Sequence, residues 1–431
     1  MRRRNSPGLK IALGCVLFHA PWVLAKDVTP QPVSVSLLAL NADATPSQRI
    51  ITDRNGVLLD AAAMSSLSYL RPGKNAENQP LQLSLEVKSN KILDEELSSG
   101  LQRFSAKAAA GFIMDVNTGE IIALSSIESG NSGSEATASG GAPPNRVTES
   151  VYEIGSSARL MTIAMALDAG KVSFASRIDG SELRYGAFTI HDSIPVRRMM
   201  TLPTAMTHGS NIAAARLAQR VGTIGQKAFL EKMGQLDSLE IDGIDRIVPT
   251  VPKNWTGLQT VATAFGCGFA VSPLQAGMAI AAMANGGTML RPTIFKLADQ
   301  ASGAAGLRVI SSDTSAKMRY LLRLNAEEGT AKKADVSGYF VGGATSTVEK
   351  VVNGKYASDR VITTFTGIYP ADKPKYLLMT IFDEPQALRE TFGLNTAAWN
   401  AAPVAAKVIE RTAPILGVER RATPPTGATP M

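Results

Sequence analysis

The chain has 431 residues, of which 45% are hydrophobic and 19% are charged. This is enough for one large core or two moderate domains. The formal net charge is +7, and four of these charges come from basic residues in positions 1–25. The small remaining excess, with no basic stripe, argues against a nucleic-acid surface. Three histidines and two cysteines leave little material for a metal site, so we expect neither a metal nor a cofactor.

Residues 1–25 have the features of an export signal. A basic segment, residues 1–10, precedes an apolar run, residues 11–25, which ends in Val-Leu-Ala with small residues one and three positions before the expected cut. Fifteen apolar residues fall short of the roughly 20 that span a bilayer. We therefore expect a cleaved signal peptide or a marginal N-terminal inner-membrane anchor, in preference to a full transmembrane helix. Both predict a periplasmic protein.

The amino-acid composition of the chain changes at Leu81. Residues 26–80 are rich in Pro, Ser, Ala and Asn and offer little core, apart from a short strand run, residues 48–56, that closes in an Asn-Gly turn. The elements predicted next are a strand at 81–85, an amphipathic helix at 89–104 and a hairpin of two apolar runs at 111–115 and 120–124. Residues 129–145 are low in complexity and predict a mobile loop.

The second half predicts a helical block followed by strands. Residues 147–290 are mainly helical, with helices at 156–169 and 273–285 and two short helices within 201–222. Strands follow at 339–352, 361–368 and 376–382, and then a closing helix at 400–412. This order predicts an α+β domain in which helices sandwich one antiparallel sheet and an all-helical subdomain is inserted.

Five stretches, in this order, carry a resemblance to a known family. They are TDRNG at 52–56, DVNTGE at 115–120, NRVTESVYEIGS at 145–156, FAVSPLQ at 269–275 followed by MANGG at 283–287, and FTGIYPAD at 365–372. The sequence resembles class B penicillin-binding proteins, especially the septal (cell-division) peptidoglycan D,D-transpeptidases. The resemblance implies a penicillin-binding transpeptidase or serine β-lactamase-like fold with a five-stranded antiparallel sheet.

The resemblance also implies a domain division. Residues 1–25 are the signal peptide or anchor, and residues 26–80 are a truncated remnant of the family's N-terminal non-catalytic (pedestal) module, because only 24 residues separate Gly56 from Leu81. Residues 81–415 form the transpeptidase-like domain, and residues 416–431 a disordered tail.

The family's chemistry needs three motifs at one cleft. In Ser-x-x-Lys, the serine attacks a carbonyl and the lysine, whose pKa is lowered by burial, takes its proton. In Ser-x-Asn, the serine relays the proton and the asparagine holds the substrate amide. In Lys-Thr-Gly, on an edge strand, the lysine and threonine bind a carboxylate, and the glycine lets the substrate lie against the backbone.

All three motifs are altered in this sequence. Ser156 keeps the nucleophile position, but Arg159 replaces the lysine, and a guanidinium carries only donors and stays charged at neutral pH. Gly209 replaces the relay serine, while Asn211 remains; Ser210 is expected to face elsewhere on the helix. The substrate-binding edge aligns with four residues: Ala344 in place of the lysine, Thr345, Ser346 in place of the glycine, and Thr347.

Non-catalytic roles are the preferred interpretation of several of these residues. We expect Ser156 to cap its helix and Arg159 to fill the cleft through a salt bridge, with a new ligand contact as the alternative. Asn211 and Thr345 are expected to satisfy buried backbone groups, and His191, which matches a family loop, to be structural.

The sequence therefore predicts a catalytically inactive homologue, a pseudoenzyme, that acts as a binding or regulatory protein in cell-wall synthesis or cell division. The expected partners are peptidoglycan stem peptides and divisome or cell-wall synthesis proteins, without nucleic acid. One alternative is an active or β-lactam-acylatable serine D,D-transpeptidase that uses Ser156. Another is a non-catalytic binder of peptidoglycan peptides.

Overall fold

The structure, a computed structural model, describes residues 51–59, 81–130, 144–241, 244–298, 306–352 and 355–422. The predicted signal or anchor at 1–25, and most of segments 26–80 and 129–145, lie outside these residues. No helix of the described part is long and apolar enough to cross a membrane. No group of His, Cys, Asp and Glu side chains in the same ranges is arranged to hold a metal ion.

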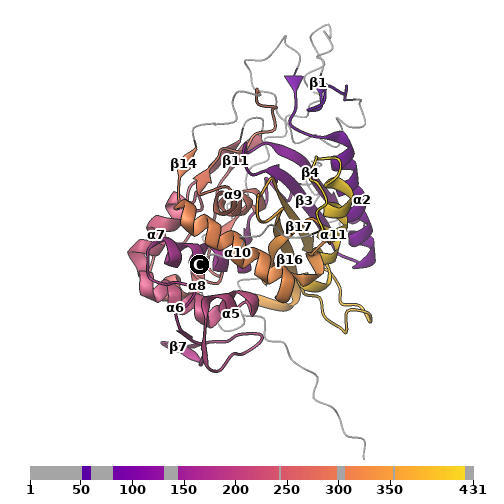
Figure 1. The fold of residues 1–431 in the computed structure, drawn as a ribbon. Coiled ribbons are helices and arrows are strands. Elements are labelled where there is room, and N and C mark those ends of the chain that lie inside the picture. Colours follow the sequence, from indigo (N-terminus) through magenta and orange to yellow (C-terminus); the bar gives the residue numbers. More distant parts are fainter. Residues whose placement is uncertain are drawn as a thin grey trace, which may run out of the picture.

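A five-stranded antiparallel sheet forms the centre of the molecule (Figure 1). Its strands run in the order β15-β16-β17-β3-β4, so the N-terminal hairpin pairs with the last strand of the chain. The bounds are β3 Ala108–Asp115, β4 Ile121–Glu128, β15 Gly342–Val352, β16 Lys355–Tyr369 and β17 Tyr376–Asp383. The predicted α+β fold with this sheet is confirmed, and β15 is the edge strand that borders the site.

Helices cover both faces of the sheet. On one face lie α2 (Val87–Arg103) and α11 (Ala401–Thr412), and on the other α4 (Ser156–Asp168), α9 (Pro273–Ala284) and α10 (Ser312–Glu328) (Figure 1). Strand β3 shows why two cores form, because successive side chains point to opposite faces. Ile113 packs into the core under α2 and α11, while Phe112 packs into the core under α4 and α9.

The predicted all-helical subdomain lies beside α4. Its helices are α5 (Leu202–Thr207), α6 (Asn211–Val221), α7 (Thr223–Lys232) and α8 (Gly257–Thr263), and α6 packs against both α4 and α8. The remaining strands form short pairs and are β1 Ile51–Thr52, β2 Leu81–Gln82, β5 Tyr152–Glu153, β6 Ile178–Asp179, β7 Leu183–Tyr185, β8 Phe188–Ile190, β9 Met199–Met200, β10 Leu239–Ile241, β11 Ile244–Ile247, β12 Ala270–Val271, β13 Thr288–Met289 and β14 Leu307–Arg308. Two 3-10 turns, η3 (Lys332–Ala334) and η4 (Ala397–Trp399), complete the described elements.

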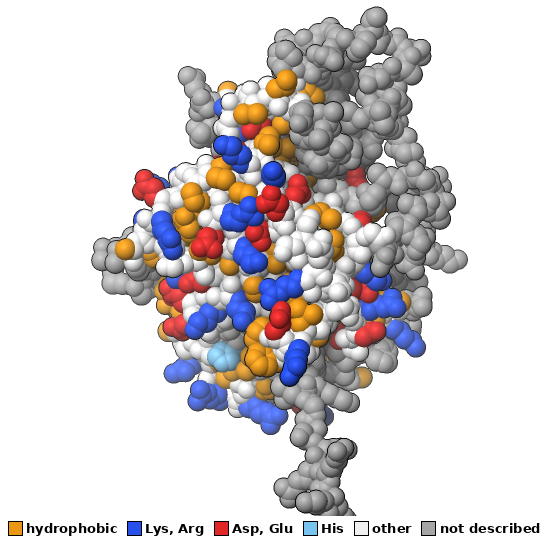
Figure 2. Space-filling model, turned by 90° about the vertical axis from the view of Figure 1, so that its right-hand side faces the viewer, with side chains coloured by type: hydrophobic (Ala, Val, Ile, Leu, Met, Phe, Trp, Pro, Cys, Tyr) orange, Lys and Arg blue, Asp and Glu red, His pale blue; other side chains and the backbone are white. Residues whose placement is uncertain are grey.

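Helix α10 and the C-terminal end of the domain differ from what the sequence predicts. Helix α10 was not predicted, although its N-cap, Ser311, accepts a hydrogen bond from the backbone of Thr314. At the C-terminus, Val418 is buried and Arg421 forms an ion pair with Asp372, so packed structure extends past the expected boundary at residue 415. On the face shown in Figure 2, basic and acidic side chains alternate without forming a stripe of one sign.

Candidate active site

Ser156 is the first residue of α4, at the centre of the expected cleft. The prediction that it caps the helix is wrong. The N-cap is Gly155, with φ +46°, and the side-chain cap bond is missing. A Cβ on Gly155 would overlap the hydroxyl of Ser346, so only glycine fits between α4 and β15. The Ser156 side chain is therefore free to face the cleft.

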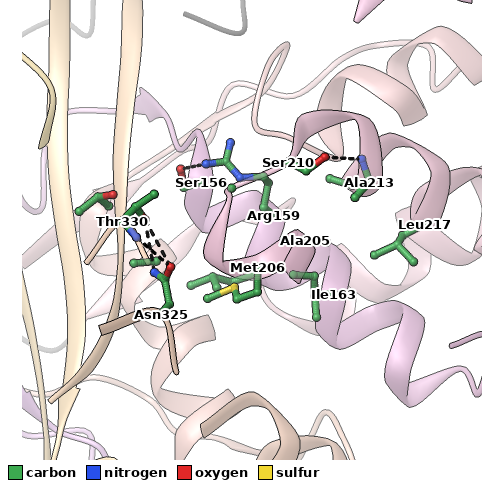
Figure 3. Close-up of a pocket in the computed structure, with 15 residues that line it drawn as sticks. Ser156, Arg159, Ile163, Ala205, Met206, Ser210, Ala213, Leu217, Asn325 and Thr330 are labelled. Atoms are coloured by element: carbon green, nitrogen blue, oxygen red, sulfur yellow. Dashed lines mark hydrogen bonds between the residues drawn. The ribbon is translucent and has the colours of Figure 1, made fainter. Parts of the chain in front are cut away.

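Arg159 lies one turn further along α4 and occupies this cleft (Figure 3). Its guanidinium donates one hydrogen bond to the Ser156 hydroxyl and a second, of 2.8 Å, to Oδ1 of Asn211. Within the described residues it forms no ion pair, so it fills the site as predicted, but through hydrogen bonds instead of the expected salt bridge. Burial lowers the pKa of Arg159 to about 10, an effect opposed by the charge of Asp192. The group thus remains a protonated donor at neutral pH.

Gly209 provides the space for this guanidinium. A Cβ at position 209 would lie 3.3 Å from Nη2 of Arg159, and the backbone there has φ +61°. The two replacements are therefore complementary: the longer side chain at 159 extends into the volume that a serine at 209 would partly fill. No hydroxyl at position 209 is left to relay a proton from Ser156.

Ser210 does not substitute for the missing hydroxyl. Its Oγ donates a 2.6 Å hydrogen bond to Asp192 and accepts one of 3.0 Å from the backbone of Ala213, because Ser210 is the N-cap of α6. This confirms that Ser210 faces away from Ser156. Asp192 also accepts a hydrogen bond from the backbone of Ile212 at 3.0 Å, and Asn211 donates to the carbonyl of His191 at 3.2 Å. These hydrogen bonds join the loop at His191 and Asp192 to the first residues of α6.

Strand β15 closes the other side of the site. The Ser346 hydroxyl accepts a 3.0 Å hydrogen bond from the backbone N–H of Ser156 and donates one of 3.3 Å to the carbonyl of Ile154. A backbone N–H at a helix start is the type of donor that stabilises an oxyanion in acyl transfer, and here that donor is occupied. Thr347 instead accepts a hydrogen bond from the backbone of Ala397 at 3.0 Å, which ties β15 to η4.

The space left around Ser156 is very small. The cleft cavity, lined among others by Ser156, Arg159, Gly209, Ala344 and Thr345, has a volume of about 20 Å³, room for roughly one water molecule. Figure 3 shows Arg159 lying between Ser156 and the start of α6 at Ser210. A cavity of this volume is too small to hold a peptide.

Residues 109–410 match the family model for the penicillin-binding protein transpeptidase domain. The chain belongs to the penicillin-binding protein transpeptidase family. The probable peptidoglycan D,D-transpeptidase FtsI of Caulobacter vibrioides is 35% identical over 379 residues, covering 86% of this chain and 64% of that protein. The probable peptidoglycan D,D-transpeptidase PenA of Neisseria gonorrhoeae is 28% identical, with 78% and 57% covered. The chain thus spans less than two thirds of the length of these relatives.

Solved structures agree with this assignment. The transpeptidase domain of penicillin-binding protein 3 from Burkholderia pseudomallei is 27% identical, with a TM-score of 0.68 over 78% of this chain and 97% of the other. A peptidoglycan glycosyltransferase from Burkholderia ambifaria is 25% identical, with a TM-score of 0.66 over 79% and 99%. This chain therefore contains nearly the whole fold of those domains.

Three residues of this transpeptidase-family site were not predicted from the sequence. Asn325, in the unpredicted helix α10, and Thr330, just after the end of that helix, line the cleft cavity. Asn325 also donates a 2.8 Å hydrogen bond to the carbonyl of Gly343. Asp192 orders the start of α6. Its signal was available, because it directly follows His191 in the family-like loop. His191 itself contributes a backbone carbonyl, in keeping with its expected structural role.

Proposed function

We propose that this chain is a catalytically inactive homologue of the septal peptidoglycan D,D-transpeptidases and acts as a binding or regulatory protein in the cell envelope. The observation that carries the proposal is the set of hydrogen bonds around Ser156. Its hydroxyl accepts from Arg159 and its backbone N–H donates to Ser346. The nucleophile position is therefore surrounded by a donor that cannot take its proton and an acceptor that occupies the oxyanion site.

Rate estimates support the loss of activity. A positioned acid or base contributes roughly 10²–10⁴ to a rate, and removing one member of a catalytic group costs about as much as removing all of them. Replacement of the carboxylate-binding lysine by Ala344 also removes a charge-assisted bond worth about 1.5–3 kcal/mol. These changes act on the proton path and the binding edge together, which leaves negligible turnover.

The proposal includes a place in the cell and partners. The signal-like residues 1–25 and the names of the relatives support export to the periplasm, with residues 26–80 as a reduced pedestal and the transpeptidase-like domain from residue 81. Peptidoglycan stem peptides and proteins of the division or wall-synthesis machinery are the proposed partners. A protein that retains the fold without the chemistry would take part in such assemblies through its surface or its altered cleft.

Labelling with a fluorescent penicillin tests the proposal directly. We expect no covalent label on the purified chain, and the same result for Ser156→Ala. A label on Ser156 that is lost in Ser156→Ala would overturn the inactive assignment and support an acylatable serine enzyme. Mass spectrometry of the peptide that contains Ser156 identifies the modified residue.

A separate measurement addresses the binding role. The chain would be crosslinked in intact envelopes and the co-purifying proteins identified, with wall-synthesis or division proteins as the expected result. Titration with a stem pentapeptide tests the cleft itself. Affinity for the peptide without acylation would support the peptide-binder alternative, whereas an absence of both peptide affinity and envelope partners would contradict the proposed role.

A further inference from the structure

A second cavity lies further along β15, beyond the cleft. We call it the β15 cavity and define it by Glu153, Phe269, Val348, Glu349, Tyr356 and Ile362 on its walls. It has a volume of about 400 Å³, within the range of small-molecule sites. Its lining includes apolar side chains, among them Phe269, Val348 and Ile362, and the carboxylates Glu153 and Glu349.

Glu349 is the unusual member of this cavity. Its side chain lines the cavity, yet the residue is only 3% exposed. Within the described residues it has neither a hydrogen-bond donor nor a basic partner, and burial alone raises its pKa. A buried carboxyl group without a partner is unfavourable unless something else compensates it. The empty space it faces is therefore the place to look for the missing partner.

Glu153 is a second carboxylate of the cavity, and it has hydrogen-bond donors. It accepts from the backbone N–H of Gly268 at 2.7 Å and from the hydroxyl of Tyr356 at 3.0 Å. These two bonds fix its position three residues before Ser156. Glu349 is thus the carboxylate of the cavity that is left without a donor among the described residues.

The basic residues of the cavity are already neutralised. Arg146 forms ion pairs of 2.7 Å with both Glu128 and Asp383. Lys350 forms ion pairs of 2.8 Å with both Asp383 and Glu384. Neither cation is paired with Glu153 or Glu349 in the described part of the chain. The cations of the cavity therefore have their charges balanced by other acids, which leaves Glu349 without a basic partner among the described residues.

We propose that the β15 cavity binds a ligand that carries a primary ammonium group on an apolar stem. The ammonium group would lie against Glu349, and the stem would pack on Phe269, Val348 and Ile362. An ammonium group has three donors and no acceptor, which suits a buried carboxylate that has no donor among the described residues. A free alkylamine and a lysine side chain of a peptide share this chemistry. The proposal is independent of the reactivity of Ser156.

Titration of the full chain with hexylammonium, at about pH 8 and followed by ligand-observed NMR, tests this proposal. We expect saturable binding that becomes about tenfold or more weaker in Glu349→Gln, because a charge-assisted bond is lost. The uncharged 1-hexanol, with the same stem, should bind about tenfold or more weakly to the wild-type chain. Glu240→Gln is the matched control, since Glu240 is exposed and does not line the cavity.

The outcomes separate the proposal from its alternatives. Equal binding of hexylammonium to wild type and Glu349→Gln, or equal binding of hexanol and hexylammonium, would overturn it. The variant should fold, because glutamine removes an unpaired buried charge, and a melting temperature equal to or above that of the wild type checks this. Binding of Nα-acetyl-lysine methylamide at the same site identifies a peptide side chain as an acceptable source, and its exclusion identifies a free amine. Ser156→Ala should bind as the wild type does, so failure of the proposed function leaves this test intact.

Discussion

The two cavities along β15 differ in size and in how their polar groups are satisfied. Around Ser156 the space is about 20 Å³, and the side chains that line it bond to one another. In the β15 cavity the space is about 400 Å³, and Glu349, one of its lining residues, has no partner in the described ranges. The strand is the same, but its residues at 344–346 serve a closed site and those at 348–351 serve an open one.

This difference is what the proposed loss of activity with retention of the fold requires. A long donor side chain enters the cleft, a glycine makes room for it, and a hydroxyl takes the vacant backbone N–H. The donor side chain and the hydroxyl each satisfy a polar group that would otherwise need water or substrate. In the β15 cavity Glu349 lacks such compensation among the described residues, and this is the physical basis for expecting a ligand there and not at Ser156.

Reversal of the four replacements should have the largest effect. A variant with Arg159→Lys, Gly209→Ser, Ala344→Lys and Ser346→Gly restores a proton acceptor, a relay, a carboxylate-binding cation and a free oxyanion donor. We expect its acylation by fluorescent penicillin to rise by about 10²-fold or more over the wild type. The same variant with Ser156→Ala is the control. If both variants stay unlabelled while they remain folded, the closed cleft is not what limits reactivity.

The pH dependence of stability tests the open cavity. Burial raises the pKa of Glu153 from its ordinary value of 4.5 to about 7. Between these values the folded state binds more protons than the unfolded state, so stability falls as pH rises. In Glu153→Gln the loss of unfolding free energy across this pH range should be smaller by about 1–3 kcal/mol than in the wild type. This range allows for partial exposure of the Glu153 side chain. Urea unfolding across this pH range measures it.

The matched control for that measurement is Glu240→Gln, which should leave the decline unchanged because Glu240 is exposed. A wild-type chain whose stability is flat or rises with pH between about 4.5 and 7 would contradict the assignment of a high pKa to this cavity. It would also reduce the contrast between the two sites.

Gly209→Ser should test the fit between positions 159 and 209. The new side chain would adopt a left-handed backbone conformation and approach the Arg159 guanidinium, so we expect a loss of about 1–2 kcal/mol in unfolding free energy. In an Arg159→Lys background the loss should be smaller. A double-mutant cycle by denaturant unfolding gives the coupling, and strict additivity would show that the two residues do not share space.

Ser346→Ala should have the smallest effect. It removes the hydroxyl that accepts from the Ser156 backbone N–H, which we expect to cost about 0.5–1.5 kcal/mol of unfolding free energy. Thr345→Val, in which the lost hydroxyl is not bonded to α4, is the comparison variant. Equal losses in the two variants would mean that the bond between α4 and β15 contributes little to closing the cleft.

Much of the fold followed from the sequence because its signals are local. The apolar run in β3 and the periodicity of α2 and α4 depend on neighbouring residues, and these elements were predicted within a few residues. Helix α10 was not predicted, and Asn325 and Thr330, which line the cleft cavity, were missed with it. Their place in the site depends on packing against β15 and not on any local pattern.

The site was predicted in its residues but not in its contacts. Motif spacing located Ser156, Arg159, Asn211 and Ser346, yet the N-cap role of Ser156 and the salt bridge of Arg159 were wrong. The cap is decided by Gly155, whose backbone must pass close to Ser346. The partners of the guanidinium are decided by α6, which lies far from α4 in the sequence. Contacts of this kind depend on tertiary structure.

The fit of Arg159 against Gly209 has a consequence for how this site can change by mutation. A single return to lysine at 159 would leave unfilled volume beside a glycine, and a single return to serine at 209 would crowd the guanidinium. Each one-step intermediate is thus less well packed than the present pair. Libraries in which both positions vary together should therefore recover well-folded variants that one-position libraries miss.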